Sequence, residues 1–446
     1  QNPDMGLLNW RKLEENFGSE SGYLGFLRDS PSAAQRLCHV LSNSRFLGDA
    51  LNKSVESVTW LGNDDSLQPR SRESLDIQTK ATLERNAGNI NDFANSIRAM
   101  RRHEIERIGL AWMSGVIDDE ASLAGMTDVY DAAIEASLQW AIQHRINDIQ
   151  IDEAPAAIAI IGMGRYGGRE VNFSSDADVI IIYRPAEGAD DDQANLFARK
   201  VQEDLRAILQ GPTTFEPKIE LDMDLRPEGK NGPLVRSYAS CEEYYRSWAS
   251  TWEHQALLRA RYAAGDASLA EDFLMNIADP LRYPKIDLTE TQIAEIRKLK
   301  ARMEAERLPR GVRRDRHLKL GKGGLSDVEW TIQLLQLQHA GDNANLRVNG
   351  TLQALNELEH RKLISAGDAV VLRKAWRMCT AARNGSYLWS GRVNQADILP
   401  DDSYSLGGIA VYLGYDANRG QHFENDLLAV IRKARDVTER LFYGRS

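Results

Sequence analysis

The sequence predicts an α+β protein in which a small β-rich core, residues 151–280, lies between a helical N-terminal region, residues 1–150, and a C-terminal helical bundle, residues 281–446. Two β-branched apolar runs flank a glycine turn within residues 158–183. A run that alternates apolar and charged residues follows at 218–227, and apolar residues recur at helical spacing before and after this segment. With 446 residues, 42% of them hydrophobic, the chain is long enough for two or three domains.

The N-terminal region is predicted to be helical from Gly6 to about Asp148. Pro31 follows Ser30 at a position where a helix can begin. Residues 89–116 form one long predicted helix, and the run from Arg98 to Arg107 mixes both signs of charge at i, i+3 and i, i+4 spacing. That mixture is typical of a solvated helix face. A further helix over residues 128–147 leads to the core.

The core begins with an apolar run from Ile158 that ends in a glycine turn. A second β-branched run ends at Tyr183, and Asp176 and Asp178 stand just before it. Alternate residues of a strand point to the same side, so the two aspartates project together and offer two hard oxygen ligands. This pair predicts a site for a divalent metal ion.

A third strand is predicted over residues 218–227. Its apolar side holds Ile219, Leu221, Met223 and Leu225, and its charged side holds Glu220, Asp222, Asp224 and Arg226. A second group of carboxylates beside the first is costly unless a cation lies between them. Asp222 is therefore the candidate third ligand, although a strand with one solvated face would also carry such residues.

The C-terminal region is predicted to be helical, and Thr289 with Gln292 forms a capping box at its first helix. A glycine-rich loop with Lys319 and Lys322 runs into a further helix. Such a loop can present backbone N–H groups and a helix N-terminus to phosphate. A capping box of Ser326 with Glu329, and Asp327 at the helix N-terminus, explain part of the same pattern structurally.

Residues 162–167 match the GxGxxG fingerprint of dinucleotide-binding enzymes. That fingerprint expects an acidic residue about 20 positions later, at the end of the second strand. Here the acids at 176 and 178 come before the second strand, so the spacing argues against a Rossmann unit. These glycines either let a phosphate group come close to the backbone or let the strand pack closely against the following helix. The sequence is equally consistent with both roles.

The order of elements suits metal-dependent nucleotidyl transfer: strand, glycine turn, two acids on a strand, then a third acid on a later strand. Two Mg²⁺ ions between such carboxylates can bridge the α-phosphate and neutralise the leaving pyrophosphate. Walker A, HExxH, GxSxG and EF-hand motifs are absent from the sequence.

Composition narrows the partners and the compartment. The net charge of −10 and the pI near 5.5 argue against nucleic-acid binding, and no apolar run approaches membrane-spanning length. The cysteines, Cys38, Cys241 and Cys379, are odd in number and far apart, which predicts a reducing, cytoplasmic setting. The chain begins with Gln1 rather than Met, and we expect it to be part of a longer protein.

Four segments together resemble glutamine synthetase adenylyltransferase: Gly162–Glu170, Asn172–Val179, Leu221–Gly229 with Gly232–Val235, and Lys319–Trp330. That family has two homologous halves, each a nucleotidyltransferase domain of the DNA polymerase beta type followed by a helical bundle. One half attaches AMP and the other removes it. The opening Asn2-Pro3-Asp4 and the chain's ending resemble the C-terminal, adenylylating half, whereas Asn172-Phe-Ser-Ser resembles the deadenylylating half.

The resemblance implies that Asp176, Asp178 and Asp222 carry Mg²⁺ and that Asp222 helps to deprotonate the attacking hydroxyl. It implies ATP as the AMP donor, a tyrosine of glutamine synthetase as the acceptor, and control by a PII-type signal protein and glutamine. Candidate ATP-contacting residues are Gly162, Gly164, Arg165, Ser175, Arg226, Lys230, Lys319 and Lys322. Two alternatives stay open: the reverse reaction, in which phosphate removes AMP from the tyrosine to give ADP, and a non-catalytic module that binds a nucleotide or a signal protein.

Overall fold

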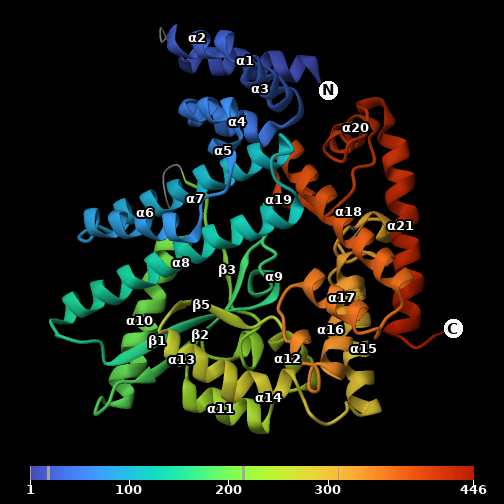
Figure 1. Cartoon of the computed structure of the whole chain (residues 1–446). Coiled ribbons are helices and arrows are strands. Elements are labelled where there is room, and N and C mark those ends of the chain that lie inside the picture. Colours follow the sequence, from blue (N-terminus) through green and yellow to red (C-terminus); the bar gives the residue numbers. More distant parts are fainter. Residues whose placement is uncertain (1, 18–20, 213–215, 310, 446) are drawn as a thin grey trace.

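The computed structural model describes residues 2–17, 21–212, 216–309 and 311–445, and it is predominantly helical with one small mixed sheet. In Figure 1 the N-terminal helices lie at the top, the sheet at the lower left and the C-terminal helices at the right. The N-terminal region contains α1 (Pro3–Phe17), α2 (Ser21–Asp29), α3 (Pro31–Asn43), α4 (Arg45–Lys53), η1 (Val55–Gly62), α5 (Asp64–Leu67), α6 (Arg72–Arg85), α7 (Ile90–Met113) and α8 (Asp119–Ile149).

The sheet joins segments of the middle of the chain. These segments are β1 (Ala156–Gly162), α9 (Gly164–Gly167), β2 (Ala177–Pro185), α10 (Asp191–Gln210), β3 (Leu221–Asp222), η2 (Gly229–Asn231), β4 (Val235–Ser237), α11 (Tyr238–Ser247), α12 (Thr251–Leu257), β5 (Arg261–Gly265), α13 (Ala267–Asp272), η3 (Phe273–Ala278) and α14 (Asp279–Arg282). The strand order is β3-β2-β1-β5, and β4 also pairs with β2. β1 is antiparallel to β2 and to β5, whereas β3 and β4 run parallel to β2.

The C-terminal region is a bundle of helices: α15 (Glu290–Glu306), η4 (Arg314–Arg316), α16 (Leu325–His339), η5 (Ala344–Leu346), α17 (Thr351–His360), α18 (Ala366–Ser390), α19 (Val393–Ala396), α20 (Ser403–Tyr412), η6 (Ala417–Arg419) and α21 (Gly420–Leu441). The capping box of Thr289 with Gln292 is present at α15, as predicted. Within the described residues, no helix combines the length and the apolar composition needed to cross a bilayer.

Both faces of the sheet are buried, which explains why its central strands have continuous apolar runs. Ile158, Ile160 and Val179 belong to the large core beneath α8 and α10. Ile161 and Ile180 belong to a second core beneath α11 and α13. The large core continues from Met5 to Phe442, so it joins all three predicted regions.

The antiparallel pairing of β1 and β2 confirms that the glycine turn is not part of a Rossmann unit, because a βαβ crossover would make these strands parallel. The turn is followed by α9, a helix of only 4 residues.

The charged run on α7 was predicted to be a solvated face, and this prediction is wrong. Arg98, Arg101 and Glu104 are buried. The Arg98 guanidinium donates to the carbonyls of Ile208 and Gly211 at 2.8 and 2.9 Å, at the end of α10. The run is therefore an interface between layers of the fold rather than a face toward water.

The predicted third strand is much shorter than its pattern suggested. β3 contains only Leu221 and Asp222, although burial alternates from Lys218 to Asp224 as expected. β4 pairs with Ile181–Tyr183 along the same edge of β2, which leaves β3 only the first residues of that edge.

Candidate active site

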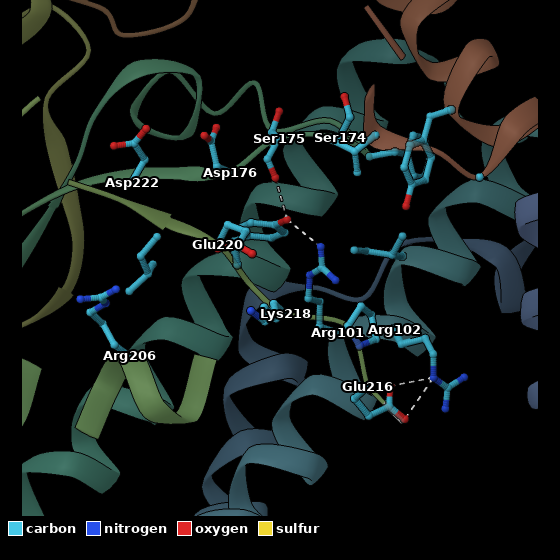
Figure 2. A pocket seen from close by; sticks show the side chains of 18 of the residues that line it. Arg101, Arg102, Ser174, Ser175, Asp176, Arg206, Glu216, Lys218, Glu220 and Asp222 are labelled. Carbon is cyan, nitrogen blue, oxygen red and sulfur yellow. Dashed lines mark hydrogen bonds and ion pairs between the residues drawn. The ribbon is translucent and has the colours of Figure 1, made fainter. Parts of the chain in front are cut away.

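Three aspartates converge at one end of the sheet. Asp178 is the second residue of β2, and Asp222 is its partner in the parallel β2–β3 ladder. Asp176 lies just before β2, and Figure 2 shows its side chain beside that of Asp222. The adjacent strands thus bring together the acids that the sequence analysis proposed as metal ligands.

The charges of these acids act on one another. Burial, and then the carboxylates of Asp176 and Asp222, raise the pKa of Asp178 to about 7. Lys319 and Arg307, which come from the C-terminal region, lower the same pKa. Carboxylates that raise the pKa of a neighbouring carboxyl repel it, and a cation between them relieves that repulsion.

The glycine turn after β1 packs directly against Asp178. The N–H of Met163 donates to the Asp178 carbonyl at 2.8 Å, next to the last pair of the β1–β2 ladder. Gly164 has φ +52°, and a Cβ added there would lie 2.1 Å from Oδ2 of Asp178. A Cβ at Gly167 would lie 2.0 Å from the carbonyl oxygen of Arg259. Both positions therefore need glycine for close packing, the first of them against a candidate metal ligand.

Asp222 is oriented by its own chain. Its Oδ1 accepts the backbone N–H of Asp224 at 2.7 Å, and the Asp224 carboxylate lies 3.2 Å from Nζ of Lys230. The buried Arg226 donates to the carbonyls of Met223, Lys230 and Gly232 at 2.7, 3.0 and 2.9 Å. These bonds hold the loop after β3 together, so Arg226 has a structural role. Of the two phosphate candidates in this loop, the side chain of Lys230 is the more exposed.

A hydrogen-bonded turn precedes Asp176. Ser175 Oγ donates to Oδ1 of Asn172 at 2.7 Å and accepts the Asn172 N–H at 3.0 Å. The Ser175 carbonyl accepts from the Tyr130 hydroxyl at 3.1 Å, which in turn accepts from Nη2 of Arg101 at 2.8 Å. Helices α7 and α8 thereby support the residue before Asp176.

Arg101 and Tyr130 are contributors that sequence reasoning missed. The only signal in the sequence was the charged run on α7, and it was assigned to solvent. Tyr130 carries no local signal at all, because its role depends on which loop packs above α8.

The glycine-rich loop of the C-terminal region supplies Lys319, which acts on Asp178, while the Lys322 side chain is exposed. The loop is held by the buried Asp327, whose Oδ2 accepts the Gly323 N–H at 2.6 Å and which pairs with Lys300 and Arg435. These bonds account for the Asp327 carboxylate structurally.

The predicted capping box of Ser326 with Glu329 is wrong. Gly324 occupies the N-cap of α16, without a side-chain cap. Glu329 instead accepts from Nη1 of Arg165 at 2.6 Å, while Arg165 Nε donates to the Glu170 carbonyl at 3.1 Å. Arg165, a candidate ATP-contacting residue, thus joins the glycine turn to the helical bundle.

The donor chemistry fits Mg²⁺ delivered with a nucleotide. The described residues contain no group of three or more His, Cys, Asp or Glu side chains that could hold a metal ion by themselves. Mg²⁺ seldom uses such a cage, because it keeps several waters and is bound by one or two carboxylates together with substrate phosphates. Converging carboxylates whose repulsion already raises the pKa of Asp178 are suited to that mode of binding.

A cavity of about 1080 Å³ opens beside Asp176 and Asp222. Its lining comes from α4 and α7, from the loop that contains Ser175, from β3 and from the end of α18. Asp178 and Lys319 are not part of this lining, so the acids lie between the cavity and the glycine turn.

Comparisons with known proteins agree on one family. A family model described as glutamate-ammonia ligase adenylyltransferase matches residues 34–276, just over half of the chain. A second model, GlnD PII-uridylyltransferase, matches residues 296–442.

Three relatives are each named bifunctional glutamine synthetase adenylyltransferase/adenylyl-removing enzyme. The protein of Bifidobacterium longum strain DJO10A is 79% identical over 446 residues, which is 100% of this chain and 41% of that protein. Those of Leifsonia xyli subsp. xyli and Mycobacterium avium are 42% and 41% identical over 99% of this chain, which spans 42% and 44% of their lengths. The chain thus spans about two fifths of the length of these relatives. It belongs to the glutamate-ammonia ligase adenylyltransferase family.

Proposed function

We propose that this chain is a nucleotidyltransferase that moves AMP from MgATP to a tyrosine of glutamine synthetase and releases pyrophosphate. The observation that carries the proposal is the convergence of Asp178 and Asp222, on adjacent strands, with Asp176 just before the first of them, beside a glycine turn and Lys319. The printed names of the relatives support the acceptor and the group transferred.

The proposed core is a nucleotidyltransferase domain of the polymerase beta type within residues 151–280, followed by a helical bundle within 281–446. The two matching family models support a boundary in this place, since the first ends at residue 276 and the second begins at 296. The match of the bundle to a PII-uridylyltransferase model supports a PII-type signal protein as a regulatory partner. Glutamine as an effector is proposed from the family resemblance.

In the proposed reaction the phenolic oxygen of the acceptor tyrosine forms a bond to the α-phosphorus of ATP. The bond from that phosphorus to the oxygen that bridges to the β-phosphate breaks, and pyrophosphate leaves with this bond's electron pair. Asp222 accepts the phenolic proton and passes it to solvent. The chain's task is mostly to orient the reactants and to compensate charge.

Asp176, Asp178 and Asp222 would hold Mg²⁺, which when bound supplies the positive charge that phosphates and a departing pyrophosphate require. Gly164 leaves room for the Asp178 carboxylate, and the Asp224 N–H orients Asp222. Lys319 adds a positive charge on the side of Asp178, where it can meet a phosphate.

The second candidate function is the reverse half-reaction, in which inorganic phosphate attacks the AMP–tyrosine bond and ADP leaves. The relatives' names include an adenylyl-removing activity, which supports this reverse reaction as a candidate. A non-catalytic module that binds a nucleotide or signal protein is the third, and the convergence of the three acids argues against it.

One experiment separates the candidates. In a first mixture, unmodified glutamine synthetase is incubated with this chain and MgATP. In a second, AMP-modified glutamine synthetase is incubated with this chain and phosphate. The mass of glutamine synthetase from both is measured by mass spectrometry. Adenylylation predicts the added mass of AMP on a tyrosine in the first mixture. Loss of AMP in the second alone would support the reverse reaction, and no change in either would refute both.

A further inference from the structure

The cavity beside Asp176 and Asp222 has the lining of a site for a protein segment. We propose that it binds the acceptor: an acidic segment of the protein substrate whose tyrosine side chain reaches the three aspartates. This inference rests on the proposed function, and it adds the acceptor's location and the charge of the segment that is recognised.

The position of the cavity favours an acceptor over a nucleotide. Asp176 and Asp222 are in its lining, whereas Gly164, Arg165, Lys319 and Arg307 are not. Of the ATP-contact candidates, Ser175, Arg226 and Lys230 also line it, but Arg226 is held by carbonyls of its own loop and Lys230 pairs with Asp224. The glycine turn and Lys319 therefore lie on the Asp178 side of the acids. An in-line displacement brings the attacking and leaving oxygens to opposite sides of the phosphorus, so the cavity lies where the attacking hydroxyl would enter.

The cavity is as large as a generous small-molecule pocket, which is room enough for a side chain and its neighbours. Pockets for small molecules have volumes of roughly 300–1,000 Å³, and this one is about 1080 Å³. It also lies between three parts of the chain rather than inside one of them, as Figure 2 shows for the helices below Ser175 and Asp176.

One wall of the cavity is aromatic. Phe173 and Tyr387 stack with their ring centroids 5.9 Å apart at 10°, and Phe46 lies 5.0 Å from Tyr387. These rings come from the loop before Asp176, from α18 and from α4, and all three line the cavity. Aromatic rings arranged in this way can take up a further ring by offset or edge contact, which is the kind of contact a tyrosine offers.

The other walls carry positive charge that the chain leaves uncompensated. The acids Asp49, Glu216 and Asp224 already form ion pairs with Lys12, Arg102 and Lys230. In the described part of the chain, no ion pair is made by the cationic groups of Lys53, Arg101, Arg206 or Lys218, which also line the cavity.

Glu220 also lines the cavity. Apart from the three aspartates of the candidate active site, it is the one acid of the lining that forms no ion pair within the described ranges. Figure 2 shows Arg101, Arg206 and Lys218 along the side of the pocket away from Asp222. Arg101 is buried, and its Nε lacks a hydrogen-bond partner among the described residues. A segment with acidic residues near its tyrosine complements this charge.

The test uses charge reversal at exposed positions, where folding is not at stake. Lys53→Glu and Arg206→Glu reverse charges in the cavity, and Lys80→Glu, at an exposed residue of α6 outside the cavity, is the matched control. Binding of unmodified glutamine synthetase to the full chain is measured by surface plasmon resonance without nucleotide, at low and high salt. The Michaelis constant for ATP is measured separately.

We expect both cavity variants to weaken binding about tenfold at low salt and less at high salt, because rim charges are screened. Lys80→Glu should bind as the wild type does, and the Michaelis constant for ATP should stay within about twofold in all variants. Unchanged binding of glutamine synthetase by the cavity variants would overturn the inference while leaving the proposed transfer intact. A rise in the Michaelis constant for ATP without weaker binding would also overturn it, since the cavity would then hold the nucleotide. Weakened binding without AMP transfer by the wild type would instead refute the proposed function alone.

Discussion

The contact between Gly164 and Asp178 allows the proposed site to be tested by a single methyl group. At φ +52°, a Cβ on residue 164 would lie 2.1 Å from Oδ2 and 2.8 Å from Cγ of Asp178. Ordinary contact begins near 3.4 Å, so the Gly164→Ala variant must displace the carboxylate by more than about 1 Å. A shift of that size costs on the order of 10²-fold in rate when the displaced group positions the reactants. The backbone conformation adds about 1–2 kcal/mol of destabilisation.

Gly188→Ala separates these two effects. Gly188 also has positive φ, +77°, but a Cβ there would have no atom within 4 Å. It lies beyond the far end of β2 from Asp178. Both variants should therefore show lowered midpoints of thermal unfolding, Gly164→Ala at least as much as Gly188→Ala, and only Gly164→Ala should lose about 10²-fold in kcat/KM for AMP transfer. Retention of activity by Gly164→Ala to within about threefold of Gly188→Ala would refute the reasoning.

Asp176→Asn and Asp178→Asn should each lower kcat by at least about 10³-fold, because they weaken the hold on a cation that supplies several kcal/mol of charge stabilisation; unchanged circular dichroism would show that the fold survives, and native turnover would contradict the assignment. Lys319→Ala should raise the Michaelis constant for ATP about tenfold, and by more than Lys322→Ala, since Lys319 is the lysine that acts on Asp178; initial rates at varied ATP measure both. Burial raises the pKa of Glu106 from 4.5 to about 8, so between these pH values the folded chain keeps a proton that the unfolded chain has lost, and stability falls as pH rises. Glu106→Gln should therefore raise the thermal midpoint at pH 8 and change it little at pH 5, and an equal shift at both would argue against a protonated Glu106.

Local signals were enough for several elements. Pro31 opens α3 and Thr289 caps α15, as expected, because capping depends on residues within one turn. The two central strands were predicted from runs of β-branched residues that no exposed strand would carry. The spacing of Asp176 and Asp178 from the glycine turn was likewise enough to reject a dinucleotide-binding unit, and the antiparallel ladder agrees.

Other features depended on what packs against them. The charges on α7 have the spacing of a solvated face, yet Arg98 and Arg101 are buried because α10 and α8 supply their partners. The alternation at residues 218–224 persists in burial, but pairing requires a free edge, and β4 occupies most of it. Glu329 has the spacing of a capping residue and instead meets Arg165, a residue 164 positions away.

The sequence by itself determined the helical and β-rich segments, the family, and the acids and glycines that the candidate site needs, because these are written in short patterns of residue type and spacing. Only the tertiary structure decided that Asp222 pairs with Asp178, that Lys319 comes near enough to act on Asp178, and that α4, α7 and α18 line a cavity beside these acids. The physical reason is that proximity between residues far apart in the chain follows from the burial of apolar faces against one another, which no local pattern specifies.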